Sequence, residues 1–178
     1  MRPIGERVYP VGRLDYLSEG LLLLTNDGAL VERLMHASSH VPKTYLVKVS
    51  GTPSEEAIEK LRRGVVLKTA DGRRSDVEDK NTAPLHRRRE KREKTAPAKI
   101  RLLKEAANPW YEVTLIEGRN RQIRRMFEQV GHHVEKIKRV RYGPLELDVE
   151  PGQFRALTPA EVGRLKVAVK NKLRVSGF

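Results

Sequence analysis

The stretch VGRLDYLSEGLLLLTNDG, residues 11–28, places a carboxylate, Asp15, between an arginine and an apolar run. In a chain whose formal net charge is +13, such a carboxylate is a candidate nucleophile, proton acceptor or partner of a cation. A nucleophilic carboxylate must stay ionised while shielded from water, and a nearby guanidinium favours that state. Taken alone, Asp15 would by default be a surface turn residue or the ion-pair partner of Arg13.

Basic side chains crowd a second segment, RNRQIRRMFEQVG, at residues 119–131. Its apolar residues Ile123, Met126, Phe127 and Val130 have the spacing of a buried helix face, so we expect a helix here. Cations at a helix N-terminus have the wrong sign for the helix dipole, so we expect an anion to offset them. A phosphate or a carboxylate from elsewhere in the fold would do so, and a basic helix face in water is the alternative.

Composition narrows the class of partner and of chemistry. The 36 Lys and Arg against 23 Asp and Glu favour a polyanion, most commonly nucleic acid, although the charge alone could serve solubility. The lack of cysteine excludes disulfides, thiolate zinc sites and a cysteine nucleophile, and His132 and His133 lack the spacing of a helical metal pair, so we expect no metal. No apolar run approaches the roughly 20 residues of a membrane span, and residues 1–10 lack the apolar region of a signal peptide. We therefore expect a cytoplasmic protein without a membrane partner.

Strand and helix patterns are mixed without a regular βαβ rhythm, which predicts an α+β fold with a mostly antiparallel sheet and flanking helices. Strands are expected at residues 21–24, 43–50, 64–68, 99–103, 110–117, 134–142, 145–147 and 153–157, and helices at 29–37, after 52–55, at 119–131 and after 158–161. Residues 52–55 and 158–161 each match a capping box with proline at the first helical position. The last helix should bury Val162, Leu165 and Val169, and Trp110 should lie in the core.

One segment does not resemble core. Residues 79–99, DKNTAPLHRRREKREKTAPAK, are dense in Arg and Lys and almost free of apolar residues, so we expect a mobile loop. It would be either a solvated linker or an additional RNA contact.

Five blocks of the chain together resemble a known family. They are GRLD with the following GLLLLTNDG, VPKTYLVKVSG, EGRNRQIRRMFEQVGHHV, KRVRYGPLELD and PGQFRALTPAEV. Their order and spacing resemble those of the bacterial ribosomal pseudouridine synthases, which comprise type A for the small ribosomal subunit, and types B, E and F for the large one. The resemblance is closest to type B. It covers nearly the whole chain apart from the basic insertion and the last few residues.

This resemblance implies a cofactor-free isomerase that converts a uridine in ribosomal RNA, here of the large subunit, into pseudouridine. The bond from ribose C1′ to uracil N1 breaks, the base turns in place, and a bond from C1′ to C5 forms. By the resemblance, Asp15 matches the nucleophile, which would attack the base or the sugar or abstract a sugar proton. Tyr45 would lie against the flipped uracil and help to move its proton, and Arg124 would pair with the aspartate, with Arg125 as the rival for that place.

The chemistry of these residue types agrees with the implied roles. A uracil stacked in RNA is out of reach, so its nucleotide must be extruded at a cost of a few kcal/mol. An aromatic side chain such as Tyr45 offsets about 1–3 kcal/mol of lost stacking, and its hydroxyl can donate and accept a proton. Further polar residues of the same blocks are expected to bind RNA: Arg13, Lys43, Arg119, Asn120, Arg121, Gln122, Arg125, Lys138 and Arg139.

The domain implied by the resemblance covers residues 1–170, with the insertion at 79–99 and a tail at 171–178. Family members usually carry an S4 RNA-binding domain and an opening strand before GRLD, whereas 14 residues precede Asp15 here. Without these parts we expect an uncovered sheet edge, which could promote a homodimer. The alternative function is a non-catalytic RNA-binding fragment of the same fold. A basic ribosome-associated protein would explain the charge, but not the Asp, Tyr and Arg blocks.

Overall fold

A mostly antiparallel sheet forms the centre of the molecule, as the sequence predicts. The computed structural model describes residues 5–36, 39–68 and 92–170. The order of the main strands is β10-β9-β4-β8-β7, and β2 pairs with β9 outside this row. The strands are β2 (Ser18–Gly20), β4 (Lys43–Val49), β7 (Lys99–Lys104), β8 (Trp110–Leu115), β9 (Val134–Tyr142) and β10 (Leu145–Glu146). Only the pairing of β2 with β9 is parallel, so the α+β prediction is confirmed.

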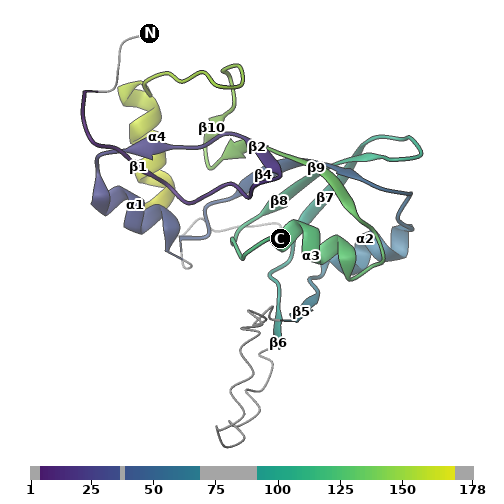
Figure 1. The fold of residues 1–178 in the computed structure, drawn as a ribbon. Helices are drawn as coiled ribbons and strands as arrows, with labels where there is room; N and C mark the ends of the chain where they lie inside the picture. Colours follow the sequence, from purple (N-terminus) through teal and green to yellow (C-terminus); the bar gives the residue numbers. More distant parts are fainter. Residues whose placement is uncertain (1–4, 37–38, 69–91, 171–178) are drawn as a thin grey trace, which may run out of the picture.

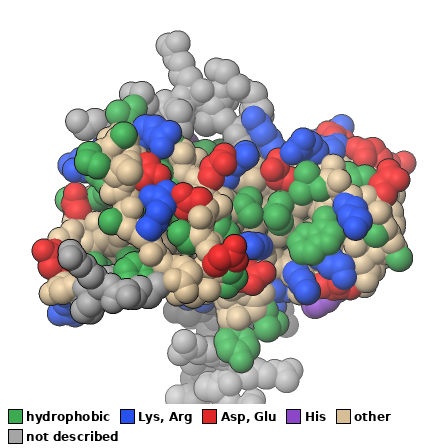
Figure 2. Space-filling model, turned by 90° about the horizontal axis from the view of Figure 1, so that it is seen from above, with side chains coloured by type: hydrophobic (Ala, Val, Ile, Leu, Met, Phe, Trp, Pro, Cys, Tyr) green, Lys and Arg blue, Asp and Glu red, His purple; other side chains and the backbone are tan. Residues whose placement is uncertain are grey.

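Two helices, α2 (Glu55–Arg62) and α3 (Gln122–Glu128), cover the lower face of this sheet in Figure 1. The alternation predicted for β4 is present, because Val47 and Val49 are fully buried in the core with the helices. Lys48 points to the other face beside Trp110, its partner in β8. Trp110 is only half-buried there, so its predicted place in the core is wrong. Figure 2, seen from above, shows acidic, basic and hydrophobic side chains side by side.

A second, smaller core lies beside the sheet (Figure 1). Its elements are α1 (Gly28–Met35), α4 (Pro159–Lys170) and the short ribbon of β1 (Tyr9–Pro10) with β3 (Leu24–Thr25). Leu34 of α1 and Leu165 of α4 are buried together with Tyr142, the last residue of β9. This core is therefore joined to the end of the main sheet through Tyr142.

Side-chain caps fix where the helices begin. Asp27 accepts a hydrogen bond from Leu30 N and starts α1. Thr158 and Glu161 exchange the bonds of the predicted capping box at the start of α4. In α2 the cap is Ser54, which accepts from Ala57 N, so the box predicted from Thr52 is wrong.

Two strand predictions also need correction. The run at residues 21–24 is not a buried strand: Leu23 is buried, but Leu22 and Leu24 are 39% and 47% exposed. The chain crosses here from the main sheet to the second core, so its apolar residues face different sides. Residues 153–157 form no strand; they lead into the cap of α4, where Thr158 N donates to Glu161. In α4 the buried residues are Leu165 and Ala168, with Val162 and Val169 half-buried.

The basic insertion has secondary structure at its C-terminal end. Arg92–Lys94 form β6, which pairs with β5 (Val66–Lys68). Thr95 N donates to Val65 O, and Ala98 N donates to Arg62 O, which ties the segment to the end of α2. Part of the predicted loop is thus a short paired strand, residues 79–91 lie outside the described part, and the mobility of the insertion stays a prediction. The predicted tail, residues 171–178, also lies outside the described part.

The described sheet ends in β10 on one side and β7 on the other. Leu102 and Leu103 of β7 are 42% and 43% exposed, and the homodimer through an uncovered edge stays a prediction. Among the described helices, none has the length and apolar character needed to cross a membrane.

Candidate active site

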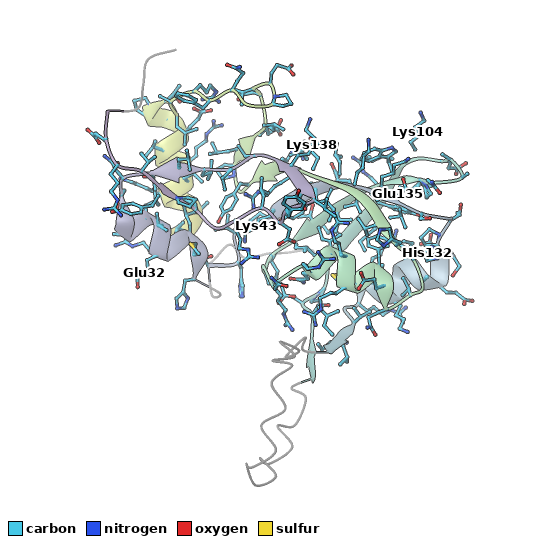
Figure 3. The ribbon with its side chains drawn as sticks, viewed as in Figure 1. Glu32, Lys43, Lys104, His132, Glu135 and Lys138 are labelled. Atoms are coloured by element: carbon cyan, nitrogen blue, oxygen red, sulfur yellow. The ribbon has the colours of Figure 1, made fainter. Side chains whose placement is uncertain are left out.

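A cavity of about 360 Å³ lies where the segment around Asp15, strands β4 and β9 and the start of α3 meet. Asp15 and Tyr45 both line it. Basic side chains surround them: Arg13, Lys43, Arg119, Arg121 and Arg139. In Figure 3 Lys43 lies between the side of the molecule that carries α1 and the side that carries α3. A cavity of this size falls in the usual range for small-molecule sites, about 300–1,000 Å³.

Asp15 opens a tight turn at the edge of this cavity. Ser18 N donates to Asp15 O over 2.8 Å, which closes the turn before β2. The carboxylate side chain is 23% exposed and lies 3.7 Å from Nη2 of Arg13, whose side chain is 76% exposed. Asp15 therefore forms the ion pair with Arg13 that the sequence suggested as one of two default roles. Because this pair is long and Arg13 is largely exposed, the carboxylate can still bind a ligand.

Arg124 stabilises the backbone of this turn through a hydrogen bond to Leu17. Its side chain is 2% exposed, with Nη2 donating to Leu17 O over 2.7 Å and Nη1 donating to Val134 O over 2.5 Å. The predicted ion pair with Asp15 is not formed: Nη1 and Nη2 of Arg124 hold backbone carbonyls, and its Nε is buried without a hydrogen-bond partner in the described part of the chain. Among the described residues, Arg13 is the cation within ion-pair distance of Asp15. Burial and the nearby Arg121 lower the pKa of Arg124, while Asp15 opposes this, so the two charges still influence each other.

Arg125, the rival for this place, is half-buried and donates to Asn120 O over 3.5 Å. It does not line the cavity, and Arg124 is the arginine that faces the core. The helix is also shorter than expected, since α3 begins at Gln122. Arg119 and Arg121 therefore precede it, with Arg121 in the left-handed region at φ 48°.

A second buried arginine fixes the other end of the same segment. Arg139 is 3% exposed, and its Nε donates to Leu21 O over 2.7 Å. Between the two clamps, Gly20 lies against β9 so closely that a Cβ atom would come within 2.2 Å of Arg139 O. Only glycine allows this approach at φ +109°.

Tyr45 stands on β4 directly opposite Arg139 in the β4–β9 register. Burial raises the pKa of the Tyr45 phenol, and the negative charge of Asp15 adds to the rise, whereas Arg139 opposes it. Asp15, Tyr45 and Arg139 are therefore electrostatically coupled around one cavity.

Lys43, two residues before Tyr45, is half-buried, and its Nζ donates to Val41 O over 3.1 Å. Its ammonium lies 5.3 Å from the ring centre of Tyr142. Burial, followed by repulsion from Arg139, lowers the pKa of Lys43 to about 8.

The predicted RNA-binding residues divide into two groups. The cavity is lined by Arg13, Lys43, Arg119, Asn120, Arg121, Gln122 and Arg139, and Arg125 and Lys138 lie outside it. Gln122 is buried, and its amide donates to Glu117 over 2.6 Å, so it organises the loop rather than facing a ligand. In Figure 3 Lys138 lies on the upper side of the sheet, away from Lys43.

Among the lining residues that were not predicted from the sequence, Glu117 and Tyr142 make contacts with predicted ones. Glu117 accepts hydrogen bonds from Arg119 and Gln122 and holds the loop before α3. Tyr142 forms the wall beneath Lys43 and Arg139, and burial raises its pKa to about 12. The alternation of β9 was the available signal for Tyr142, whereas no local pattern marked Glu117.

Two other features of the described residues lack the character of this cavity. A hollow of about 320 Å³ lies beside α2 and β7; of its charged lining residues, Glu55 and Arg62 are paired with each other, and the third is Glu105. Within the described ranges, no group of three His, Cys, Asp or Glu side chains could hold a metal ion.

Comparison with known proteins identifies the family. A family model described as RNA pseudouridylate synthase matches residues 3–129. The ribosomal large subunit pseudouridine synthase B of Bacillus subtilis is 44% identical over 167 residues, which are 92% of this chain and 59% of that relative. A ribosomal large subunit pseudouridine synthase E of Vibrio parahaemolyticus is 40% identical and is covered to 60%, with 84% of this chain matched.

A solved structure described as a crystal structure of pseudouridylate synthase superposes with a TM-score of 0.70 at 31% identity, covering 89% of this chain and 59% of that one. The chain belongs to the RNA pseudouridylate synthase family, as the resemblance predicted. It spans about 59% of the length of the Bacillus subtilis relative.

Proposed function

We propose that this chain isomerises a uridine of ribosomal RNA, in the large subunit, to pseudouridine, with Asp15 as the nucleophile. The observation that carries the proposal is that Asp15 and Tyr45 face one cavity walled by cations. The names of the relatives, which refer to the large ribosomal subunit, support the substrate class.

In the proposed reaction an extruded uridine enters the cavity, and Asp15 attacks the base or the sugar or takes a sugar proton. Tyr45 lies against the uracil, offsets part of the lost stacking and relays the proton that leaves C5. Arg124 positions Asp15 by holding the Leu17 carbonyl. The isomerisation itself needs no external oxidant or cofactor, because the atoms of uridine and pseudouridine are the same.

RNA would be held by the basic residues that line the cavity, above all Arg13, Lys43, Arg119 and Arg121. Arg125 and Lys138 would contact RNA only outside the cavity. We further propose that residues 1–170 act as one catalytic unit, that it works in the cytoplasm, where ribosomal RNA is found, and that two copies can pair along the exposed β7 edge.

Release of tritium from ribosomal RNA labelled at uridine C5 tests the function, because the isomerisation exchanges this hydrogen. Wild-type protein should release tritium from large-subunit RNA, and Asp15→Asn should release none. Glu19→Gln, which changes an exposed acid of the same segment, is the matched control and should behave as wild type.

The outcomes separate the alternatives. RNA binding without release by the wild type would favour a non-catalytic RNA-binding protein. Equal release by wild type and Asp15→Asn would remove Asp15 from the reaction, and release from small-subunit RNA alone would contradict the proposed target.

A further inference from the structure

Arg139 is a buried arginine that borders the cavity. The β4–β9 register sets it opposite Tyr45, and directly opposed residues of antiparallel strands project to the same face. The side chain is 3% exposed, although it also borders the cavity. A side chain that is so enclosed is poorly placed to contact an RNA phosphate, which would remain near solvent.

Two contacts hold the guanidinium of Arg139 in place, but neither of them neutralises its positive charge. Nε is bound to Leu21 O, and the group lies 5.5 Å from the ring centre of Tyr142. Neither contact is a carboxylate. Its Nη2 is buried and, within the described part of the chain, has no hydrogen-bond partner. Burying a cation in this way is costly, so a compensating role for its charge is expected.

The positive charge of Arg139 acts on the phenol of the neighbouring Tyr45. Burial and Asp15 both disfavour negative charge on the phenol oxygen, and Arg139 is the group that opposes them. A fixed cation beside a phenol stabilises the phenolate, so a larger fraction of the side chain is in the form that can accept a proton.

We propose that Arg139 is a positioning residue that acts through Tyr45, supplying the positive charge that favours the phenolate form of Tyr45, which can accept a proton. This inference rests on the proposed function. In the step concerned, the C5–H bond breaks after C5 has joined C1′, its electron pair returns to the uracil ring, and the proton passes to the phenolate oxygen of Tyr45, which becomes the phenol. Uracil N1 gains a proton as the product forms, so the step needs no further reactant.

The titration of Tyr45 tests this directly, without RNA. In protein carrying tyrosine labelled with carbon-13 at Cζ, the Tyr45 signal is assigned by its loss in Tyr45→Phe. Arg139→Gln can still donate to Leu21 O but has no charge, so it should raise the midpoint of the Tyr45 titration by about one pH unit. Arg139→Lys should shift it by less than half as much.

The matched control is Arg141→Gln, two residues along the same strand, where the arginine is exposed and paired with Glu146. It should leave the Tyr45 midpoint unchanged. An unchanged midpoint in Arg139→Gln, or an equal shift in Arg139→Lys, would overturn the inference. If Arg139→Gln does not fold, Arg139→Met, which also removes the charge, takes its place: a raised Tyr45 midpoint supports the inference, and an unchanged midpoint overturns it.

Turnover separates this inference from the proposed function. In active protein, Arg139→Gln should lower kcat about tenfold at neutral pH with KM unchanged, because the proton acceptor is less available. An inactive wild type with a shifted titration would contradict the proposed function alone. An active wild type with an unshifted titration would contradict the role of Arg139 alone.

Discussion

Arg124 acts near Asp15 in two ways, through its hydrogen bonds and through its charge. The guanidinium that the family resemblance assigns to the carboxylate instead holds the carbonyl next to it, at Leu17, and a second carbonyl at Val134. Its charge still acts on Asp15 from nearby, while its hydrogen bonds fix the backbone. Geometry and charge are therefore supplied by the same buried side chain.

We predict that Arg124→Lys will impair catalysis while leaving RNA affinity within a factor of about two, since Arg124 does not line the cavity. Lysine keeps the charge but cannot hold both carbonyls, so the variant should lose roughly 1–3 kcal/mol of unfolding free energy and most of its kcat. Denaturant unfolding, RNA binding and tritium release measure the three effects. Arg125→Lys is the matched control, and equal losses in both variants would argue against the clamp.

Lys43 allows a prediction about pH. Its pKa is about 8 in the folded protein against an ordinary 10.5, so the unfolded chain binds more protons between these values. The cost of burying the charge is therefore full below pH 8 and is relieved as the pH rises toward 10.5. Lys43→Met should be more stable than wild type at pH 7, and the difference should narrow by pH 10.

Urea unfolding at the two pH values measures this difference. Lys104→Met, at an exposed position far from Lys43 in Figure 3, should show no such change with pH. A stability gain of Lys43→Met that does not depend on pH would assign the effect to packing. The same variant should bind RNA more weakly, which would mark Lys43 as a residue kept for binding at the expense of stability.

At the scale of elements, the parallel pairing of β2 with β9 positions the residues of the candidate site. This pairing joins Ser18–Gly20 to Ile137–Arg139 and so brings the turn of Asp15 beside the β9 residue that faces Tyr45. Gly20 makes it possible, because any side chain at this position would meet the backbone of Arg139.

Gly20→Ala should therefore displace β2 and abolish activity. We expect a loss of about 2–4 kcal/mol of unfolding free energy, since both the contact and the backbone angle are unfavourable. Gly163→Ala is the contrasting control, because it lies exposed within α4 with no atom within 4 Å of the new Cβ. It should stabilise the protein by about 0.5–1 kcal/mol. Wild-type activity in Gly20→Ala would show that the β2–β9 contact is not needed.

At the scale of the whole molecule, the net charge of the protein and the position of its basic side chains have different consequences. The charge of +13 attracts any polyanion, but the face in Figure 2 mixes both signs, whereas basic side chains gather around the cavity. Long-range attraction should therefore bring RNA to the protein, and the cavity should decide where it binds.

Affinity for RNA should fall steeply as salt is added, with a slope of log affinity against log salt of about 0.7 per phosphate contacted on single strands. Arg121→Ala, at an exposed residue on the cavity rim, should reduce the magnitude of the slope by about 0.7. Lys60→Ala, at an exposed residue of α2 that does not line the cavity, should leave the slope unchanged. Equal changes in both variants would mean that binding follows net charge and not the site.

Local patterns were sufficient for much of the fold. Alternation along β4 and the capping box of α4 were correct because each depends on neighbours in sequence. Predictions failed where distant segments compete. Leu22 and Leu24 are exposed because the chain crosses between two cores, and part of the basic segment, expected as a loop, is a strand because β5 pairs with it.

The sequence by itself determined which side chains could take part: an aspartate, a tyrosine and arginines in blocks that mark the family. Only the tertiary structure decided what each arginine holds, since Leu17 and Arg124 are 107 residues apart and the facing of Arg139 toward Tyr45 depends on strand register. The physical reason is that a guanidinium offers five donors to any oxygen within reach, and which oxygens come within reach is a property of the folded chain.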